Sequence, residues 1–383
     1  MSLRSLVIES VAIREVRNLA SVDVTLSPGL TVVFGDNGHG KTTLLEALYL
    51  VASSRSFRSA KLGELVRHGQ TTASVRAQLR ESAGGADRDR VREQSAGIAR
   101  SRISVRIDGT RPASLAAYAT RTPVVVFHSD ELALSSGTAS LRRRLLDRLV
   151  LYREPAAADA LARYGVALRA RQDLLRREIR NGPALDAYET ICADEGARVT
   201  RARRSAVTAL EPFLRHAFAE IAEPGLQLSI GYASAGSDDP ALASAELDSM
   251  RDRDAHRTSA SFGPHRDDLL LGLGGHPTRI VASQGQHRAL VLSLKAAESS
   301  CIAAATGLLP ILLLDDVSSE LDPRRTEALF RFLAEPIEGA PTPPQIVLTT
   351  TRPDLIPKGL GQGAPRREIH LENGAISGTP DAG

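Results

Sequence analysis

Hydrophobic and polar residues alternate over the first 26 residues of the chain. The apolar positions in this stretch include Leu6, Ile8, Val11, Ile13, Val22, Val24 and Leu26. A period of two predicts half-buried β-strands joined by turns. After Pro28-Gly29 the pattern changes, because residues 30–34 are almost continuously apolar and residues 42–52 carry apolar side chains at helical spacing. We therefore expect a buried strand, a glycine-rich loop and a helix in succession.

The middle of the chain has a different pattern. Residues 82–102 are polar and contain glycine, so we expect a solvated, mobile loop or a hairpin insertion there. Residues 122–127 predict another buried strand. From about residue 141 to residue 218 the sequence is rich in Arg and Ala, with Leu161, Leu168 and Leu175 seven residues apart. This stretch predicts an antiparallel pair of helices, and the turn is expected at residues 181–183 (Asn-Gly-Pro), which would break a helix.

The C-terminal third returns to strands and loops. Residues 309–314 are a buried apolar run, residues 323–333 have a helical pattern and residues 345–350 predict a final strand. Together with the N-terminal strands they predict one α/β lobe that is interrupted by the helical lobe. We expect residues 1–132 to form the first half of the α/β lobe, residues 133–261 an inserted helical arm or lid, and residues 262–383 the second half.

Composition restricts the class of protein. The charged residues are 24% of the chain, with 48 Lys or Arg against 45 Asp or Glu and a net charge of +3, which is typical of a globular protein and excludes a disordered or collagen-like chain. Aromatic residues are only 4% and Trp is absent, so a nucleic acid would be contacted through its sugar-phosphate backbone rather than by base stacking. Cys192 and Cys301 support neither a disulfide framework nor a zinc site, and no apolar run is long enough to predict export or a membrane span. We expect a protein of the reducing cytoplasm.

The strongest chemical signal is Gly-Asp-Asn-Gly-His-Gly-Lys-Thr at residues 35–42, which satisfies GxxxxGK[ST] between the predicted strand and helix. Such a loop turns backbone N–H groups toward the β-phosphate of a nucleotide at a helix N-terminus, the lysine reaches the β- and γ-phosphates, and the threonine is a ligand of Mg²⁺. The alternative is a chance glycine turn. The candidate ATP-binding residues are Gly35, Asn37, Gly38, Gly40, Lys41, Thr42 and Thr43, with Thr42 also a candidate metal ligand.

A second motif supports the first. Residues 311–314 are four apolar residues followed by Asp315 and Asp316, and a carboxylate at the end of a buried parallel strand is where P-loop folds hold the metal. We expect Asp315 to bind Mg²⁺ directly or through water. Asp316 and Lys41 are the candidate catalytic residues, with Asp316 polarising the attacking water. A surface pair of aspartates that caps a helix is the alternative.

Two further motifs lie in the order found in ABC ATPases. Residues 283–286 (Ser-Gln-Gly-Gln), followed by a predicted helix, resemble the ABC signature, in which Ser283, Gly285 and Gln286 would bind the γ-phosphate held by a second copy. A plain turn is the alternative for this motif alone. Residues 319–322 resemble the D-loop, which makes Asp322 a further candidate. A signature that acts on the nucleotide of a second copy implies an ATP-dependent homodimer.

The spacing of these motifs narrows the choice of family. Lys41 and Ser283 are 242 residues apart, which is more than transporter ATPases usually insert and less than the long arms of SMC proteins need. The chain resembles the RecF family of bacterial recombination mediator ATPases. The match rests on the sequences at residues 16–18, 35–42, 44–47, 263–269, 283–286, 312–317 and 319–322.

The resemblance implies an α/β P-loop NTPase of ABC/SMC type, with a mixed sheet flanked by helices and an inserted helical arm. It implies a weak, DNA-stimulated ATPase that uses ATP and Mg²⁺, acts in DNA repair, recombination, replication and the SOS response, and places Arg17 at the nucleotide. It also implies that an ATP-dependent homodimer clamps DNA at gaps or junctions and helps to load a recombinase with mediators of the RecR/RecO type, in the cytoplasm at the nucleoid and without a membrane. The sequence departs from the family at residues 129–132 and 136–140, so the turn into the arm is expected to differ.

Two other classes of protein remain open from the residues alone. A transporter-energising subunit would be found with a membrane partner, and residues 349–351 (Thr-Thr-Thr) stand where transporters place a switch histidine. An ATPase head that regulates a nuclease or another defence effector would be encoded beside that effector.

The excess positive charge lies in the helical lobe. Residues 142–216 contain 16 Arg and no Lys against 10 Asp or Glu, a net charge of +6, which suggests a sequence-independent phosphate-binding face. A solvated helix face with internal ion pairs is the alternative. Near this lobe His265, Asp267 and Asp268 lie within four residues, and we expect a bracing role for them rather than a metal site. The candidate DNA-binding residues are Arg142, Arg143, Arg144, Arg176, Arg177, Arg201, Arg203 and Arg204.

Overall fold

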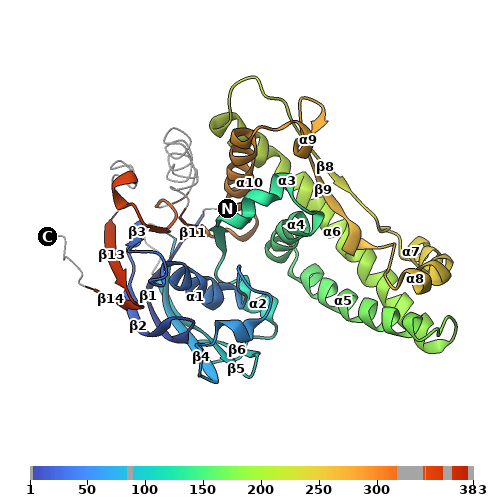
Figure 1. Ribbon diagram of the computed structural model, residues 1–383, viewed down its shortest axis with the longest axis horizontal. Coiled ribbons are helices and arrows are strands. Elements are labelled where there is room, and N and C mark those ends of the chain that lie inside the picture. The colour runs from blue at the N-terminus through green and yellow to red at the C-terminus, as the bar shows by residue number, and fades with distance from the viewer. Residues whose placement is uncertain (1–2, 84–88, 317–339, 341, 357–364, 378–383) are drawn as a thin grey trace. The chain divides into compact units, whose positions relative to one another are not determined.

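The computed structural model describes residues 3–83, 89–316, 340, 342–356 and 365–377 (Figure 1). The chain divides into two compact units. The first comprises residues 1–132, 216–222 and 288–383, and the second comprises residues 133–215 and 223–287. The predicted end of the helical insertion, at residues 261/262, differs from this division. The reason is that residues 268–273 form a strand of the second unit, where they pair with residues 228–233.

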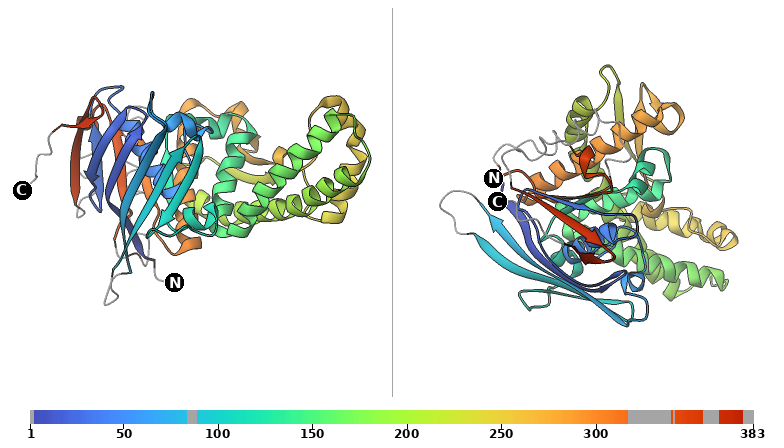
Figure 2. Two further views of the ribbon diagram at one scale, coloured as in Figure 1. Left: turned by 90° about the horizontal axis from the view of Figure 1, so that it is seen from below. Right: turned by 60° about the vertical axis from the view of Figure 1, so that its left-hand side comes forward.

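The described residues of the first unit form two β-sheets. One sheet has the order β2-β1-β4-β5-β6, and its neighbouring strands run antiparallel; the other has the order β14-β13-β3-β12-β11-β7, with five parallel strands and the antiparallel β14 (Figure 2). The strands of the first sheet are β1 (Ser5–Val16), β2 (Leu19–Thr25), β4 (Thr72–Ser82), β5 (Arg90–Ala99) and β6 (Arg102–Ile107). Those of the second are β3 (Leu30–Phe34), β7 (Val124–Phe127), β11 (Ile311–Asp315), β12 (Ile346–Thr350), β13 (Arg366–Glu372) and β14 (Ala375–Ile376).

Helix α1 (Lys41–Ser53) packs in the core of this unit. Nearly all of its residues are buried, and its leucines share one hydrophobic cluster with side chains of both sheets, among them Ile13, Val75 and Leu313. The alternating strand β1 buries one face, whereas β3, β7 and β11 are buried on both faces, as their continuous apolar sequences predict. The short helices in the described part of this unit are α2 (Leu115–Ala119), η1 (Leu62–Leu65), η2 (Ser129–Leu132) and η4 (Pro353–Leu355).

The polar stretch at residues 82–102 is a β-hairpin rather than a loop in its described part. Strand β5 pairs with both β4 and β6, and its side chains alternate, so that Arg92, Gln94, Ala96 and Ile98 are buried. Val91 and Ile98 are the large apolar residues of this strand, too few for the hydrophobic pattern to decide between the loop and the hairpin that the sequence left open. The buried Arg92 is neutralised by Glu81 on β4, with 3.2 Å between Nη1 and Oε2.

The second unit consists mostly of helices. Helices α5 (Pro155–Arg176) and α6 (Pro183–Ile221) are antiparallel, since Arg163 binds Glu195 and Arg171 binds Glu189 in reversed order. The predicted helical pair and its turn at residues 181–183 are confirmed. The remaining elements are α3 (Ala133–Ser136), α4 (Ala139–Arg153), α7 (Pro240–Ser249), α8 (Arg251–Arg257), α9 (Thr278–Val281), η3 (Pro264–Arg266) and the small sheet of β8 (Leu228–Ala233), β9 (Asp268–Leu273) and β10 (His276–Pro277).

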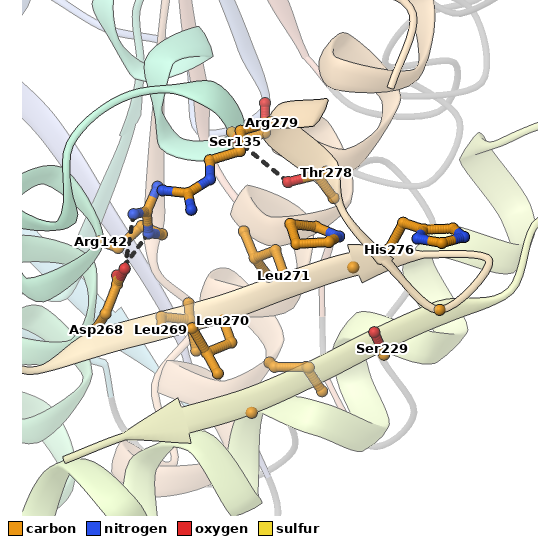
Figure 3. A pocket seen from close by; sticks show the side chains of 15 residues that line it. Ser135, Arg142, Ser229, Asp268, Leu269, Leu270, Leu271, His276, Thr278 and Arg279 are labelled. Atoms are coloured by element: carbon orange, nitrogen blue, oxygen red, sulfur yellow. Dashed lines mark hydrogen bonds and ion pairs between the residues drawn. The ribbon is translucent and has the colours of Figure 1, made fainter. Parts of the chain in front are cut away.

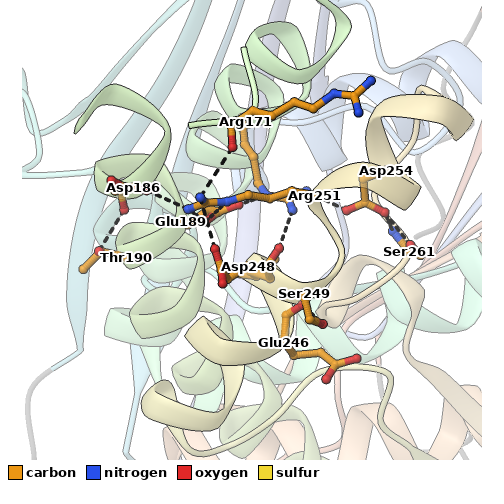
Figure 4. Close-up of polar contacts among 12 residues, drawn as sticks. Arg171, Asp186, Glu189, Thr190, Glu246, Asp248, Ser249, Arg251, Asp254 and Ser261 are labelled. Carbon is orange, nitrogen blue, oxygen red and sulfur yellow. Dashed lines mark hydrogen bonds and ion pairs between the residues drawn. The ribbon is translucent and has the colours of Figure 1, made fainter. Parts of the chain in front are cut away.

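A buried ion network holds α5, α6 and the α7–α8 turn together (Figure 4). The Arg171 side chain is fully buried, and it donates to Glu189 at 2.9 Å and to Asp254 at 2.6 Å. Arg251 adds a second guanidinium to Glu189, at 2.5 Å, and reaches Asp186 at 2.6 Å. These arginines neutralise the acids of the unit, so they contribute to packing rather than to its outer charge.

Helix α10 (Gln284–Thr306) is long and apolar enough to cross a membrane, but 78% of the relevant window is buried inside the protein. Lys295, on its buried side, lies 2.9 Å from Glu131 and 2.5 Å from Glu298. A helix with paired buried charges and protein contacts over most of its surface is a core helix. Its residues from 288 onward belong to the first unit.

Candidate functional site

The glycine-rich loop connects β3 to α1, and its shape requires glycine at two positions. A Cβ on Gly35, which has φ +149°, would lie 2.2 Å from the carbonyl oxygen of Leu371. A Cβ on Gly40, at φ +106°, would lie 2.7 Å from the Leu19 side chain. Gly38 also has positive φ, but open space surrounds its Cβ position. The loop is therefore closely backed by protein on one side and open at Gly38, as a phosphate cradle must be.

Lys41 begins helix α1 and folds back over this loop. Its Nζ donates to the carbonyl oxygens of Gly35 and Asp36, both at 2.8 Å. Partial burial lowers the pKa of Lys41, and the carboxylates of Asp316, Asp315 and Asp36 act in the opposite direction. The ammonium group is thus held by loop carbonyls at the mouth of the cradle, where a phosphate oxygen could replace them.

Thr42 and Asp315 meet at the carboxyl edge of the parallel sheet. The Thr42 hydroxyl donates to Oδ1 of Asp315 at 2.8 Å, and the hydroxyl of Thr349 donates to the same oxygen at 2.8 Å. Asp315 on β11 stands beside Thr349 on β12 in the strand register. Hydroxyl and carboxylate oxygens are the ligands that Mg²⁺ prefers, so these residues fit the metal predicted from the sequence.

Asp316 follows the last residue of β11 in a left-handed conformation, with φ +50°. Its backbone N–H donates to the carbonyl oxygen of Thr349 at 3.1 Å. This bond fixes the point at which the chain leaves the sheet, directly beside the Asp315 carboxylate. Asp322, the candidate in the D-loop, lies outside the described residues.

Side chains next to the loop form hydrogen bonds and an ion pair that hold it in place, and the sequence did not predict these contacts. Arg17, which the resemblance places at the nucleotide, makes a two-point ion pair with Glu46 of α1, at 2.5 and 2.9 Å. Asn18 donates to the carbonyl oxygen of Gly38 at 2.9 Å and accepts from the Thr43 hydroxyl at 2.9 Å. Thr43 therefore supports the loop from behind. No local pattern around residues 17, 18 and 46 could have indicated these contacts, because they depend on how β1 and α1 pack.

The signature residues form a capping box in the second unit. Gln286 N–H donates to the Ser283 hydroxyl at 3.2 Å, and Ser283 N–H donates to the Gln286 side chain at 2.9 Å. Such a reciprocal pair fixes the first turn of a helix. Gly285 lies in that turn, so the three candidates Ser283, Gly285 and Gln286 come together at the start of α10.

Two of the eight candidate DNA-binding arginines are buried. Arg142 makes a two-point ion pair with Asp268, at 2.7 and 2.9 Å, and Arg203 lies 2.7 Å from Asp147 and 3.1 Å from Asp267. Their relative exposures are 8% and 2%. This corrects the prediction for both residues, because a guanidinium that neutralises internal carboxylates is unavailable to a phosphate.

The other six arginines retain some exposure but lie in different places. Arg143 is half-buried and donates to the carbonyl oxygen of Asp267 at 2.7 Å. Arg204 is exposed and binds Asp238. Arg177 is exposed and binds Asp173 at 2.8 Å, one turn away on α5. The remaining exposed candidates are Arg144, Arg176 and Arg201.

These arginines do not form one patch along the helical pair. The pairing of Arg163 with Glu195 places residue 201 of α6 near the start of α5. Arg176 and Arg177 lie at the end of α5. At 1.5 Å per residue the two sets are about 30 Å apart along the helices. The arginines at the start of α5 and those at its end could therefore contact different parts of a DNA duplex.

The segment at residues 263–269 braces the second unit, as expected. Asp267 is fully buried and accepts from Arg203, from Tyr232 and from the Ala235 backbone at 2.9 Å. His265 lies 2.6 Å from the Tyr164 hydroxyl. Within the described part of the chain no group of three His, Cys, Asp or Glu side chains is arranged to hold a metal.

An open pocket of about 410 Å³ lies beside this segment, against β8 and β9 (Figure 3). The Arg142–Asp268 ion pair stands at one end, and the Thr278 hydroxyl donates to the Ser135 carbonyl at 2.9 Å on another side. The charge of Arg142 is balanced by Asp268, so only the exposed residues His276 and Arg279 could contribute basic groups to the wall.

Comparison with known proteins agrees with this geometry. The family model for the RecF/RecN/SMC N-terminal domain matches residues 7–359. The DNA replication and repair protein RecF of Anaeromyxobacter sp. (strain Fw109-5) is 40% identical over 362 residues, which cover 92% of this chain and 94% of that protein. RecF of Myxococcus xanthus (strain DK1622) is 39% identical over 355 residues, covering 90% of each.

The chain belongs to the RecF family. The structure of the recombination mediator protein RecF-ATPrS in the RecFOR pathway matches it with a TM-score of 0.84 and 25% identity, over 98% of this chain and 99% of that one. An SMC head domain with an extended coiled coil from Pyrococcus furiosus matches with a TM-score of 0.53 and 15% identity, over 97% and 95% of the two chains, which shows the shared fold. The resemblance and the predicted RecF-type P-loop fold are confirmed, and a transporter subunit is not favoured.

Proposed function

We propose that this RecF-family chain is an ATP-dependent switch that binds DNA during replication and repair. The solved relatives with which it shares its fold over almost its whole length are described as RecF-ATP and RecF-ATPrS, in the RecFOR pathway. The observation that carries the proposal is the hydrogen bond between Thr42 and Asp315, 273 residues apart in the chain, beside a loop whose shape requires glycine. The Thr42 hydroxyl and the Asp315 carboxylate are close enough to bind one metal ion together.

In this proposal the residues of the loop and of the sheet edge have different roles in binding and hydrolysing ATP. Lys41 leaves the carbonyls of Gly35 and Asp36 to bind the β- and γ-phosphates of ATP. Thr42 and Asp315 would hold Mg²⁺, and a metal ion there would supply positive charge close to the phosphates. Asp316 orients and polarises the attacking water. Hydrolysis is slow and is stimulated by DNA.

The signature residues complete the site of a second copy. Ser283, Gly285 and Gln286 present the start of α10 to the γ-phosphate bound by that copy, and Asp322 contributes from the D-loop. A helix N-terminus with its first turn fixed by a capping box suits an anion. Two copies therefore close when ATP is bound and separate when it is hydrolysed.

The closed dimer is proposed to clamp DNA at gaps or at junctions of single and double strands and to help to load a recombinase. Binding is independent of sequence, through phosphates. The arginines that remain available are Arg144, Arg176, Arg177, Arg201 and Arg204, with a smaller part for the half-buried Arg143. We expect mediators of the RecR/RecO type as protein partners, and a location in the cytoplasm at the nucleoid.

The experiment that tests the nucleotide site compares Lys41→Ala with Lys61→Ala. Lys61 is an exposed lysine in the same unit, outside the loop. Binding of a fluorescent ATP analogue is measured by anisotropy with Mg²⁺ and with EDTA. We expect Lys41→Ala to weaken binding at least tenfold and Lys61→Ala to leave it unchanged. Normal affinity in Lys41→Ala would contradict the phosphate assignment.

A further inference from the structure

The five-stranded sheet of the first unit ends in β6, and part of the outer edge of this strand has no strand partner among the described residues (Figure 1). An edge strand with unpaired N–H and C=O groups is a template for another extended chain. Natural proteins usually cover such an edge or close it. The direction in which each backbone group of β6 points is therefore informative.

The register of β5 and β6 identifies the outward groups. Asp108 N–H donates to the Glu93 carbonyl oxygen at 2.9 Å, and this pair continues the β5–β6 register by one position. In an antiparallel ladder, hydrogen-bonded and non-hydrogen-bonded pairs alternate. The residues of β6 at odd positions therefore belong to non-hydrogen-bonded pairs. The N–H and C=O groups of Ile103 and Val105 point away from β5, toward the outer edge.

The chain closes one end of this edge and leaves the rest open. Ile107 and Thr110 exchange two backbone hydrogen bonds, both at 2.9 Å, where the chain turns back beside β6. Beyond Thr110 the returning segment does not pair with the strand. Instead, a pocket of about 340 Å³ separates residues 103–106 from residues 111–115. The open stretch thus coincides with the outward groups of Ile103 and Val105.

The pocket has both charged and apolar walls. Arg106 and Arg111 are both exposed and are the charged residues among those lining the pocket; no acidic residue lines it, and Asp108 lies two residues from Arg106, outside the lining. Arg106 donates to the carbonyl oxygen of Gly109 at 2.8 Å, which fixes its side chain without neutralising it. Ile103 is half-buried, and Leu115 has 49% of its surface exposed. A ligand that matches these walls carries negative charge and an aliphatic side chain.

We propose that β6 binds an extended acidic segment of a partner protein by strand addition. The backbone of that segment pairs with Ile103 and Val105. Because side chains alternate along a strand, its Asp or Glu residues face Arg106 and Arg111 while an aliphatic residue between them meets Ile103 and Leu115. A nucleic acid would satisfy the two arginines but has no alternating N–H and C=O groups for the strand edge. Peptide recognition by an added strand takes affinity from these main-chain bonds.

The test uses the full-length chain and a synthetic peptide, acetyl-Glu-Val-Glu-Val-Glu-amide. Amide hydrogen exchange, resolved to single residues, is followed at Ile103 and Val105 with millimolar peptide, with and without Mg-ATP. We expect both amides to become at least fivefold slower to exchange under either condition. The same peptide N-methylated at both valines keeps the charges but loses backbone donors, and it should protect neither amide.

Charge is tested by the double variant Arg106→Glu/Arg111→Glu, with Arg90→Glu as a control. Arg90 is exposed on β5, outside the pocket. The double variant should lose at least tenfold in peptide affinity, and the control should keep it. Unprotected Ile103 and Val105 amides in the unmodified protein would overturn the proposal. Equal protection by the N-methylated peptide would also overturn it, as would displacement of both peptides by a single-stranded oligonucleotide, which would assign the arginines to nucleic acid.

Discussion

The sequence suggested a phosphate-binding role for both the glycine-rich loop and the arginine-rich helices. The two regions differ in how many of the named residues lie where they could take that role. In the loop, Thr42 and Asp315 come within 2.8 Å although 273 residues separate them. Among the arginines, by contrast, Arg142 and Arg203 are buried in ion pairs with acids of their own unit. A motif that specifies backbone geometry was a better guide to the position of a site than an excess of one charge.

The physical reason lies in what each pattern constrains. The loop needs positive φ and close backbone packing at Gly35 and Gly40, and few sequences other than a glycine-rich turn meet that need. An arginine imposes no such constraint. It binds a carboxylate inside the protein as readily as a phosphate outside it, and only the fold decides which is near.

The largest effect is expected from Arg203→Met. It leaves the carboxylates of Asp147 and Asp267 without their guanidinium in a buried site, so the helical unit should lose about 3–5 kcal/mol of its free energy of unfolding. Urea denaturation followed by circular dichroism measures the loss. Arg204→Met is the matched control, because its partner Asp238 is exposed, and it should cost less than about 1 kcal/mol. Equal losses of unfolding free energy in the two variants would mean that the ion pairs of the buried Arg203 contribute no more to stability than the ion pair of the exposed Arg204.

The next effect concerns hydrolysis. Asp316→Asn should lower the ATPase rate about 100-fold, because an amide cannot polarise the water as a carboxylate does. ATP affinity should change less than about threefold, which follows from keeping Thr42, Asp315 and the loop intact. Steady-state phosphate release and analogue binding measure the two quantities. Unchanged turnover would remove Asp316 from the reaction.

A smaller effect should appear in the pH dependence of the helical unit. Burial lowers the pKa of His265, and Arg266 and Arg143 add to the shift, whereas the Ala260 carbonyl and Asp254 oppose it. The unfolded chain therefore binds a proton at a higher pH than the folded chain does. Stability should fall as the pH drops through the ordinary histidine value of about 6.5 and should go on falling to the folded pKa.

Comparing His265→Gln with His276→Gln shows how much of the pH dependence of stability is due to His265. His276 is exposed, so its replacement should keep the pH dependence of the unmodified protein. His265→Gln should flatten it between pH 7.5 and pH 5.5, as measured by the midpoint of urea unfolding. An equally steep loss of stability in His265→Gln would assign the effect to other groups.

The smallest effects are expected from the exposed arginines. Arg201→Ser/Arg204→Ser and Arg176→Ser/Arg177→Ser remove two charges each from places about 30 Å apart along the helices. Each lost phosphate contact should reduce the salt slope of DNA binding by about 1. Fluorescence anisotropy with a gapped duplex at several salt concentrations measures the salt slope of each variant and so shows which pair of arginines contacts the DNA. A slope unchanged in both variants would exclude these residues from the DNA-binding surface.

Much of the fold could be predicted because hydrophobic period and buried runs determine strands and helices locally. Strands β1, β3 and β11 and the helical pair α5–α6 are examples. Strand β5 was expected only as one of two alternatives, a loop or a hairpin, since Arg92, Gln94 and Ala96 occupy buried positions and Ile98 is the one large apolar residue among them. The bracing of the loop by Arg17, Asn18 and Glu46 depends on contacts between distant segments, and such contacts leave no local pattern.

The measurement that tests ATP-driven dimerisation most directly is the mass of the purified chain by light scattering. It is made with and without Mg-ATP, with and without a gapped duplex, at two salt concentrations. The chain of 40.9 kDa should double its mass only with Mg-ATP, and the dimer should bind the duplex in a manner that weakens steeply with salt. A chain that stays monomeric in saturating Mg-ATP and does not bind the duplex would contradict the proposed clamp.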